Sequence, residues 1–324
     1  MVKVILQDRK SAVLTASSLA CLARIPTVNL TSGCAHGCLY CYTRGYSNYP
    51  GDGKITVYKN TLEKLRNELR RKRKRPCAVY FSPSSDPFQP VPEVLDVTYE
   101  VFEFLFQAGL GVAFLTKGHI PERHMKLLQA NAPQVRAQIG LITLDAKLAG
   151  IFEPNAATPE MRLAQARTFV ESDIVNQMRL DPILAGLTDS PEELNDLCKK
   201  ISSAGVKQIA VSTLFMRRAI VTSLKRNVQD EAILGKLLDS FGQASRMAIH
   251  AGRSSVTALP ASVRRMVHER VRKAAHANGL SVKICACKNP DIATGSCSIA
   301  GDWSGSIPQA TQQGLFDNVE RGLD

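Results

Sequence analysis

Long hydrophobic runs are missing from this sequence. No apolar stretch approaches the roughly 20 residues that a helix needs to cross a bilayer, so no membrane partner is expected. Residues 11–23 are mildly apolar, but they follow three charged residues and lack a cleavage pattern with a secreted continuation, so a signal peptide is not expected. With 324 residues, 44% of them hydrophobic, the chain can fill the core of one large or two ordinary domains. The sequence indicates a soluble, cytoplasmic protein.

Acidic residues are scarce relative to basic ones. The chain has 29 Asp and Glu against 41 Lys and Arg, which gives a net charge of +12 and a pI of about 9.4. This excess favours a polyanionic partner, because Lys and Arg gain affinity by releasing counterions from phosphates; a merely basic protein has the same composition. Cations gather at Arg70–Arg75 and in a helix expected at 260–278. At Arg70–Arg75 a solvated face and a phosphate-binding patch both stay open.

The most distinctive stretch is Cys34-Ala-His-Gly-Cys38-Leu-Tyr-Cys41, and it lacks the second cysteine pair that a zinc site normally has. A disulfide would leave an odd thiol in a chain expected to be intracellular. Three closely spaced thiols, with Gly33 and Gly37 to turn the backbone, favour an iron–sulfur cluster instead. Three cysteines on a [4Fe-4S] cube leave one iron open to a substrate or cofactor.

Strand and helix patterns alternate along most of the chain. Short apolar runs alternate with amphipathic segments that open with Pro or a capping box, or close with Gly. The expected strands are 27–30, 54–59, 78–81, 111–115, 137–144, 174–180, 206–212 and 280–284; the expected helices are 61–75, 92–108, 121–130, 158–171, one that opens at Ser190, 228–240 and 260–278. This alternation predicts an α/β fold with a parallel sheet and helices outside it.

Polar segments follow several of the expected strands. Ser82–Gln89 (SPSSDPFQ) follows one strand, Thr116-Lys117-Gly118 follows the next, and Arg179-Leu-Asp181-Pro182 stands near the end of a later one. A further polar segment, Phe152–Arg162, lies between them in the sequence. In a barrel of parallel strands the catalytic groups lie at the C-terminal ends of the strands. These segments are therefore expected to surround the functional site.

Together these motifs resemble the radical S-adenosylmethionine (radical SAM) superfamily, and in particular its spore photoproduct lyase-like (DNA repair photolyase-like) branch. The resemblance covers about residues 25–220. It implies a partial (β/α)6 TIM-like barrel, to which a small cysteine-bearing C-terminal extension is added here. In that family the open iron of a [4Fe-4S] cluster binds S-adenosylmethionine (SAM), and one-electron reduction releases a 5'-deoxyadenosyl radical.

The resemblance also implies roles for individual residues. The cluster ligands are Cys34, Cys38 and Cys41. The implied SAM contacts are Tyr40 beside the adenine, Ser84 and Ser85 at the amino group, Lys117 at the carboxylate, and Gln138 and Arg179 at other polar groups. These residue types suit SAM, because its carboxylate needs a cation and its ammonium group needs acceptors. For Arg179, a structural ion pair with Asp181 is an equal alternative.

One position departs from the spore photoproduct lyase pattern. Those enzymes carry a cysteine directly before the Thr-Ser-Asp of the loop after the second strand, and this cysteine returns a hydrogen atom to the thymine radical. The matching run here is Pro83-Ser84-Ser85-Asp86. The residue at that place here is Pro83, which has no hydrogen atom to donate in this way. Thymine-dimer reversal by the same route is therefore not expected, and the candidate substitutes are Tyr42, Tyr80 and Tyr99.

A second group of cysteines, Cys285, Cys287 and Cys297, stands near the end of the chain. An auxiliary iron–sulfur cluster is the hypothesis for it, with zinc and reduced structural thiols as alternatives. No fourth ligand is evident in the sequence, which would leave an open iron at this site too. The isolated cysteines, expected to be structural thiols, are Cys21, Cys77 and Cys198.

The sequence divides into an N-terminal extension (1–24), a radical SAM core (25–250), a segment with the second cysteine group (251–302) and a flexible tail (303–324) rich in Ser, Gly, Pro and Gln. Within the tail, Gln312-Gln-Gly-Leu-Phe316 resembles the peptide by which bacterial DNA enzymes dock onto the sliding clamp. This motif, the net charge and the basic helices favour a nucleic acid as the partner.

The function expected from these observations is reductive cleavage of SAM for the repair or modification of DNA, with lyase-like or modifying chemistry. Two alternatives stay open. One is the same chemistry on RNA, a peptide or a small molecule, and the other is a non-catalytic iron–sulfur adaptor that binds DNA. An electron donor such as flavodoxin or ferredoxin is expected as a further partner.

Overall fold

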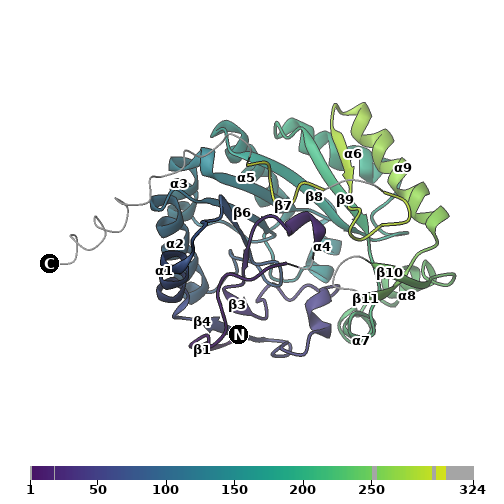
Figure 1. The fold of residues 1–324 in the computed structure, drawn as a ribbon. Coiled ribbons are helices and arrows are strands. Elements are labelled where there is room, and N and C mark those ends of the chain that lie inside the picture. Colours follow the sequence, from purple (N-terminus) through teal and green to yellow (C-terminus); the bar gives the residue numbers. More distant parts are fainter. Residues whose placement is uncertain (1, 18, 250–253, 294–296, 304–324) are drawn as a thin grey trace.

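A computed structural model describes residues 2–17, 19–249, 254–293 and 297–303. Its centre is a sheet of seven parallel strands in the order β12-β9-β8-β7-β6-β5-β2 (Figure 1). The strands are β2 (Thr27–Val28), β5 (Ala78–Phe81), β6 (Gly111–Thr116), β7 (Val135–Gly140), β8 (Val175–Ile183), β9 (Gln208–Thr213) and β12 (Ser281–Ile284). The expectation of an α/β fold with a parallel sheet is confirmed.

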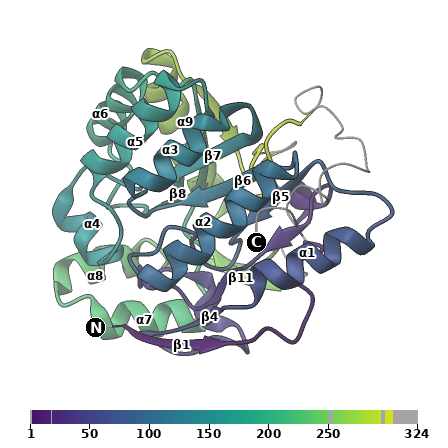
Figure 2. The ribbon, with the colours of Figure 1, turned by 90° about the vertical axis from the view of Figure 1, so that its left-hand side faces the viewer.

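Helices cover one face of this sheet, and Figure 2 shows α3, α5 and α6 in front of the strands. The covering helices are α1 (Thr61–Arg71), α2 (Pro92–Gln107), α3 (Glu122–Ala130), α5 (Pro159–Glu171), α6 (Pro191–Ser203) and α9 (Ala261–Ala277). Strand side chains alternate between the two faces. Apolar positions such as Phe81, Phe114 and Ile139 join the main hydrophobic core with these helices. The alternate positions, among them Gln138 and Arg179, face the other way, into the partial barrel.

A segment near each end of the described chain packs against this inner face. Leu22 from the N-terminal extension and Ile299 from the C-terminal segment cluster with Tyr80 of β5 and Ala113 of β6. Trp303, expected at the start of the tail, packs there too, with the Arg136 guanidinium 4.5 Å from its ring. β12, also from the C-terminal segment, adds a parallel edge strand beside β9. Residues far apart in the sequence thus fill the inside of the barrel together.

Smaller elements complete the fold. A second sheet contains β1 (Lys3–Gln7), β4 (Lys54–Tyr58) and β3 (Thr31–Ser32), and β10 (Ser245–Ile249) pairs with β11 (Ser254–Ala258). The remaining helices are η1 (Ala20–Leu22), η2 (Tyr42–Gly45), η3 (Ala132–Gln134), α4 (Ala146–Phe152), α7 (Arg218–Asn227) and α8 (Glu231–Asp239). Among the described residues, no helix is both long and apolar enough to cross a membrane.

Several expected elements differ from the observed ones by a few residues in their bounds. The helix expected at 228–240 begins at Glu231, because the Asp230 side chain caps it by accepting a hydrogen bond from the Ile233 amide, and a separate helix, α7, precedes it. The helix expected to run through the six cations ends at Arg71. The strand expected at 137–144 is Val135–Gly140.

Candidate active site

The cysteine loop connects β3 to η2, and glycine allows its tight path. Gly33 has φ +82°, and a side chain there would come within 2.7 Å of the Lys54 carbonyl oxygen, so only glycine fits. Arg44 of η2 donates hydrogen bonds to the carbonyl oxygens of Cys38 (3.1 Å) and Gly37 (3.0 Å). These bonds stabilise the loop in a form in which all three thiols reach one cavity.

This cavity has a volume of about 470 Å³ and opens at the C-terminal ends of the strands. The thiols of Cys34, Cys38 and Cys41 form part of its wall. Desolvation in the wall raises the pKa of Cys38 to about 12, with the buried Glu153 carboxylate adding to the effect. A metal cluster would reverse this balance, because thiols bind iron as thiolates and lose their protons on binding.

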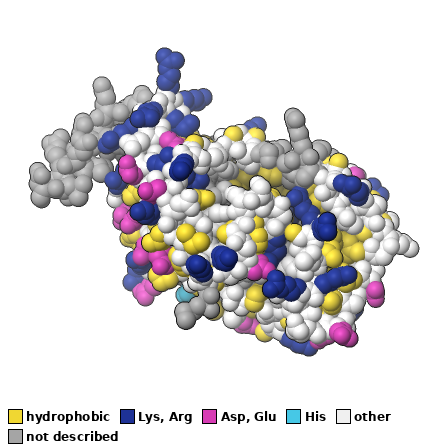
Figure 3. Space-filling model, turned by 90° about the horizontal axis from the view of Figure 1, so that it is seen from below, with side chains coloured by type: hydrophobic (Ala, Val, Ile, Leu, Met, Phe, Trp, Pro, Cys, Tyr) yellow, Lys and Arg dark blue, Asp and Glu magenta, His cyan; other side chains and the backbone are white. Residues whose placement is uncertain are grey.

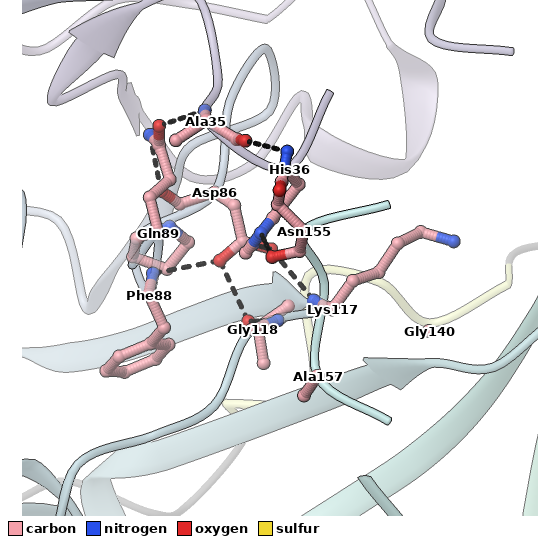
Figure 4. Close-up of polar contacts among 12 residues, drawn as sticks. Ala35, His36, Asp86, Phe88, Gln89, Lys117, Gly118, Gly140, Asn155 and Ala157 are labelled. Carbon is pink, nitrogen blue, oxygen red and sulfur yellow. Dashed lines mark hydrogen bonds and ion pairs between the residues drawn. The ribbon is translucent and has the colours of Figure 1, made fainter. Parts of the chain in front are cut away.

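His36, inside the cysteine loop, contacts Asp86 of the loop after β5 (Figure 4). Nε2 of His36 is 3.2 Å from Oδ2 of Asp86, and Nδ1 lies 3.0 Å from the carbonyl oxygen of Asn155. The Asp86 carboxylate also accepts hydrogen bonds from the amides of Phe88 and Lys117, each at 2.8 Å. Although burial opposes it, the contact with His36 and the amide hydrogen bonds lower the pKa of Asp86. One buried carboxylate therefore joins three loops around the cavity.

Lys117, which follows β6, is surrounded by acceptors. Its Nζ donates to Oε1 of Glu153 (2.7 Å), to the Tyr40 hydroxyl (2.8 Å) and to the Asp181 carbonyl oxygen (3.3 Å). Glu153 is buried and also pairs with Arg162. Although burial opposes it, the charges of Lys117 and Arg162 lower the pKa of Glu153 to about 2. This carboxylate is therefore ionised and fixes the position of Lys117.

Arg179 and Asp181 of β8 form the ion pair that the sequence left open. The Arg179 guanidinium lies 3.0 Å from Oδ2 of Asp181, and Lys288, after β12, lies 2.7 Å from the same carboxylate. Arg179 and Asp181 are both part of the cavity wall. In the other direction, the Arg179 guanidinium donates to Oε1 of Gln138 at 3.4 Å. The paired charges leave a small net positive charge on this side of the cavity.

The structure brings most of the expected site residues to one place. The cavity wall includes Cys34, Cys38, Cys41, Tyr40, Ser84, Ser85, Lys117 and Arg179. Gln138 reaches it only through Arg179, since the described lining residues do not include Gln138 itself. Of the three candidate hydrogen-atom donors, Tyr42 and Tyr80 line the cavity. Tyr99 instead packs against His124, with ring centres 5.5 Å apart, so the proposal for this residue is wrong.

Two buried hydroxyls in the wall have unused hydrogen-bonding capacity. The Oγ atoms of Ser82 and Ser85 are buried without a hydrogen-bond partner, which is costly unless a ligand supplies one. Ser82 also has φ +54°, an uncommon conformation for a residue other than glycine. Three thiols, unpartnered hydroxyls and a lysine on one cavity suit an iron–sulfur cluster with an amino-acid ligand beside it.

A comparison with family models decides the classification. The model described as the Radical SAM superfamily matches residues 28–201, which is more than half of the chain. The chain belongs to the radical SAM superfamily. Membership implies a [4Fe-4S] cluster and SAM as the cofactors of this radical SAM protein. In the described part of the chain, no three His, Cys, Asp or Glu side chains are grouped to hold a single metal ion. The fit of the site to an iron–sulfur cluster therefore rests on the three thiols of the cysteine loop and on the cavity that they line.

Two similar proteins match part of this radical SAM protein. It is 31% identical over 217 residues to Uncharacterized protein Rv2578c of Mycobacterium tuberculosis, a match that covers 64% of each chain. It is 27% identical over 179 residues to Radical SAM Nalpha-GlyT isomerase of Pseudomonas phage M6, a match that covers 55% of this chain and 37% of that one. The matched region thus spans 64% of the length of the mycobacterial relative.

Spore photoproduct lyase has a similar structure. The structure of that enzyme complexed with dinucleoside spore photoproduct has a TM-score of 0.63 and 15% sequence identity, and the match covers 87% of this chain and 82% of that chain. A mutant of the same enzyme has a TM-score of 0.65 and 14% identity, with the same coverage. At this identity the likeness establishes the fold, and it confirms the expected partial barrel of the radical SAM type.

Sequence reasoning missed three residues that shape the site. His36 lies within the cysteine motif, and Asp86 lies in the segment quoted as Ser82–Gln89, but their contact joins loops 50 positions apart in the sequence. Glu153 was part of a quoted polar segment without an assigned role, and it holds Lys117. The motifs indicated that these segments lie near the functional site. They did not indicate which of their side chains contact one another.

Proposed function

We propose that this radical SAM protein is an enzyme that cleaves SAM reductively in the described cavity and uses the product radical to repair or modify DNA. Cys34, Cys38 and Cys41 hold the [4Fe-4S] cluster, which when bound supplies the open iron and the electron for SAM cleavage. All three thiols lie on one cavity wall. A flavodoxin or ferredoxin is the proposed class of electron donor.

The chain's own residues would orient SAM next to the cluster. Ser85 offers the unpartnered buried hydroxyl as an acceptor for the amino group, with Ser84 beside it in the wall. Lys117 faces the carboxylate, but its three N–H donors already have acceptors. The contact with the Asp181 carbonyl oxygen is the longest, so it is the one that a SAM carboxylate would replace. Tyr40, Arg179 and Gln138 are left to position the rest of the cofactor.

A second hollow carries the proposal that the substrate is a nucleic acid. It has a volume of about 880 Å³, and its arginines are Arg44, Arg217, Arg218, Arg226 and Arg246. Arg217 and Val256 belong to the walls of both this hollow and the SAM cavity, so the two adjoin. Figure 3, which views the molecule from below, shows a group of Lys and Arg side chains on the right-hand side of this face. Arginines beside a reaction cavity suit a phosphate backbone that presents one base to the cavity.

The basic helix α9 contributes less than its sequence suggested. Arg264 is buried and pairs with Asp291, and Arg270 lies 2.9 Å from Asp189. These two arginines stabilise the packing of α9 instead of facing a partner, while Arg265, Arg272 and Lys273 of the same helix are exposed. The arginine-lined hollow, which adjoins the cavity, is the main support for a nucleic-acid substrate. The proposed clamp-binding peptide, Gln312–Phe316, lies outside the described residues.

The chemistry proposed for the substrate differs from that of spore photoproduct lyase at the last step. Pro83 lines the cavity where a donor cysteine would stand, and its carbonyl oxygen accepts a hydrogen bond from the Tyr42 hydroxyl. Tyr42 and Tyr80 are the phenols in the wall that can return a hydrogen atom. Modification of a base needs no such return, and this favours modification over dimer reversal.

Release of 5'-deoxyadenosine tests the proposal. Anaerobically reconstituted protein with reductant and SAM would be assayed alone, with undamaged or ultraviolet-irradiated duplex DNA, and with RNA, and Cys38→Ala serves as the control without the cluster. DNA-stimulated release is the expected result. Stimulation by RNA alone, or release that is indifferent to nucleic acid, would move the substrate to RNA, a peptide or a small molecule. DNA binding by a loaded protein that never cleaves SAM would indicate the adaptor instead.

A further inference from the structure

Four cysteines meet on another part of the cavity wall. Cys285, Cys287 and Cys297 are buried around Ala210 of β9, and Cys21 packs against the same cluster. All four sulfur-bearing residues line the SAM cavity. Cys21 comes from the N-terminal extension and the other three from the C-terminal segment. The N-terminal extension and the C-terminal segment pack together near Ile299, and this packing brings Cys21, which was expected to be an isolated structural thiol, to the second cysteine group.

The four thiols contact one another directly. The side chain of Cys21 hydrogen-bonds to those of Cys287 and Cys297. The Cys285 and Cys297 side chains are also hydrogen-bonded to each other, and the Arg179 guanidinium donates to the Cys297 sulfur. All nine cysteines of the chain are thiols in the structure, so no disulfide accounts for this grouping. Each of the four therefore touches at least one other member of the set.

Four thiols on one wall can hold a metal cluster, although no three His, Cys, Asp or Glu side chains of the described residues are grouped to hold a single metal ion. Structural zinc sites usually take their cysteines in pairs separated by two to four residues. Here a single residue separates Cys285 from Cys287, and Cys297 and Cys21 each stand alone in the sequence. Iron–sulfur clusters accept ligands from widely spaced segments, and four thiolates saturate a [4Fe-4S] cube. The positive charges of Arg179 and Lys288, both on this wall, would offset part of the thiolate charge.

We propose that Cys21, Cys285, Cys287 and Cys297 ligate a second [4Fe-4S] cluster on the wall of the cavity where SAM binds. Cys21 is the fourth ligand that the sequence did not reveal. With four cysteine ligands the proposed cluster has no open iron, contrary to the expectation from the sequence. A cluster with four protein ligands has no iron available to SAM. Addition of SAM should therefore perturb the spectrum of the first cluster and leave that of the second unchanged.

The test begins with the variant Cys34→Ala/Cys38→Ala/Cys41→Ala of the full chain, reconstituted anaerobically. Iron, acid-labile sulfide and zinc are measured, together with Mössbauer and electron paramagnetic resonance spectra. We expect about eight irons per chain in the wild type and about four in this variant, since each cube holds four. The spectrum of the variant should not respond to SAM. No activity enters this test, so its failure and that of the proposed function are distinguishable.

A second set of variants in the same background isolates Cys21. Cys21→Ala should lose the remaining iron or convert it to a three-iron form, because one iron has lost its protein ligand. Cys77→Ala is the matched control and should keep about four irons, since Cys77 is exposed. Circular dichroism and thermal unfolding verify that each variant is folded. Zinc in place of iron, a folded triple variant without iron, or an unchanged cluster in the Cys21→Ala variant would each overturn the proposal.

Discussion

Nε2 of His36 lies 3.2 Å from Oδ2 of Asp86, and this contact connects the cysteine loop to the loop after β5. Both residues are buried. The Asp86 carboxylate also binds the Thr116 hydroxyl and the Lys117 amide at the end of β6, each at 2.8 Å. The loop that carries the thiols and the loops proposed to face SAM therefore share one anchoring side chain.

Replacing Asp86 should loosen this part of the site. Asp86→Asn turns one acceptor oxygen into an amide that cannot accept the bonds from Thr116, Lys117 and Phe88 together. A buried donor left without an acceptor costs about 1–3 kcal/mol, so the free energy of unfolding should fall by that amount. Thermal and denaturant unfolding measure this loss. Asp52→Asn is the control, because that carboxylate is half exposed; an equal effect there would contradict the anchoring role.

Glu153 should make stability depend on pH in the acidic range. Its pKa in the folded protein is about 2, below the ordinary value of 4.5. A carboxyl group with a lowered pKa stabilises the fold above its unfolded pKa and loses that contribution as pH falls through its folded pKa. Stability should therefore decline between about pH 4.5 and 2, and Glu153→Gln should flatten this decline.

The same substitution should weaken the fold at neutral pH. Glu153→Gln leaves the buried Arg162 and the nearly buried Lys117 without their counter-charge. Breaking a buried ion pair on one side costs about 3–5 kcal/mol. Denaturant unfolding at a series of pH values measures both effects. A Glu153→Gln variant with wild-type stability at neutral pH would show that these charges do not depend on Glu153.

Gly118 should not tolerate a side chain. A Cβ atom there would lie 2.0 Å from the Phe88 carbonyl oxygen, so Gly118→Ala must displace the backbone next to Lys117. We expect lower thermal stability and weaker SAM binding, measured by calorimetry on the reconstituted protein. Gly150→Ala is the matched control. Nothing lies within 4 Å of that Cβ position, and alanine in helix α4 should stabilise by about 0.5–1 kcal/mol.

The arginine-lined hollow should account for salt-sensitive DNA binding. Arg218 and Arg226 are exposed there, on α7. Each phosphate contact that is lost lowers the slope of log K against log salt by roughly 0.9 for duplex DNA. Arg218→Ala/Arg226→Ala should reduce the slope by about 2, measured by fluorescence anisotropy between low and high salt. Arg272→Ala, at an exposed pair with Glu269, is the control; an equal change there would reject the hollow as the binding surface.

Local patterns sufficed for the fold and for the first cysteine site. Short apolar runs that alternate with capped amphipathic segments predicted the parallel sheet, and each motif depends on residues close in the sequence. The three motif cysteines reach one cavity together with Ser84, Ser85 and Lys117, as expected for segments that follow the strands. The helix expected at 228–240 is present, but its start was placed three residues too early because the capping role of Asp230 went unrecognised.

Contacts between distant segments were not accessible from one sequence. Cys21 and Cys285 belong to opposite ends of the chain, and only the packing of both ends inside the barrel brings them into one group. Lys117 lies at the cavity as expected, but nothing in its motif revealed that its ammonium group would form an ion pair with Glu153. Ion pairs and cysteine groups that join distant segments depend on the tertiary fold. They produce no periodic pattern in the sequence.

Transfer of deuterium from DNA tests the central proposal most directly. Deuterated duplex DNA would be incubated with the reconstituted, reduced protein and SAM, and 5'-deoxyadenosine and recovered SAM would be analysed by mass spectrometry. The proposal predicts deuterium in one of these two molecules, and none with Cys38→Ala. Unlabelled 5'-deoxyadenosine, formed at the same rate with and without DNA, would contradict DNA as the substrate of this radical SAM protein.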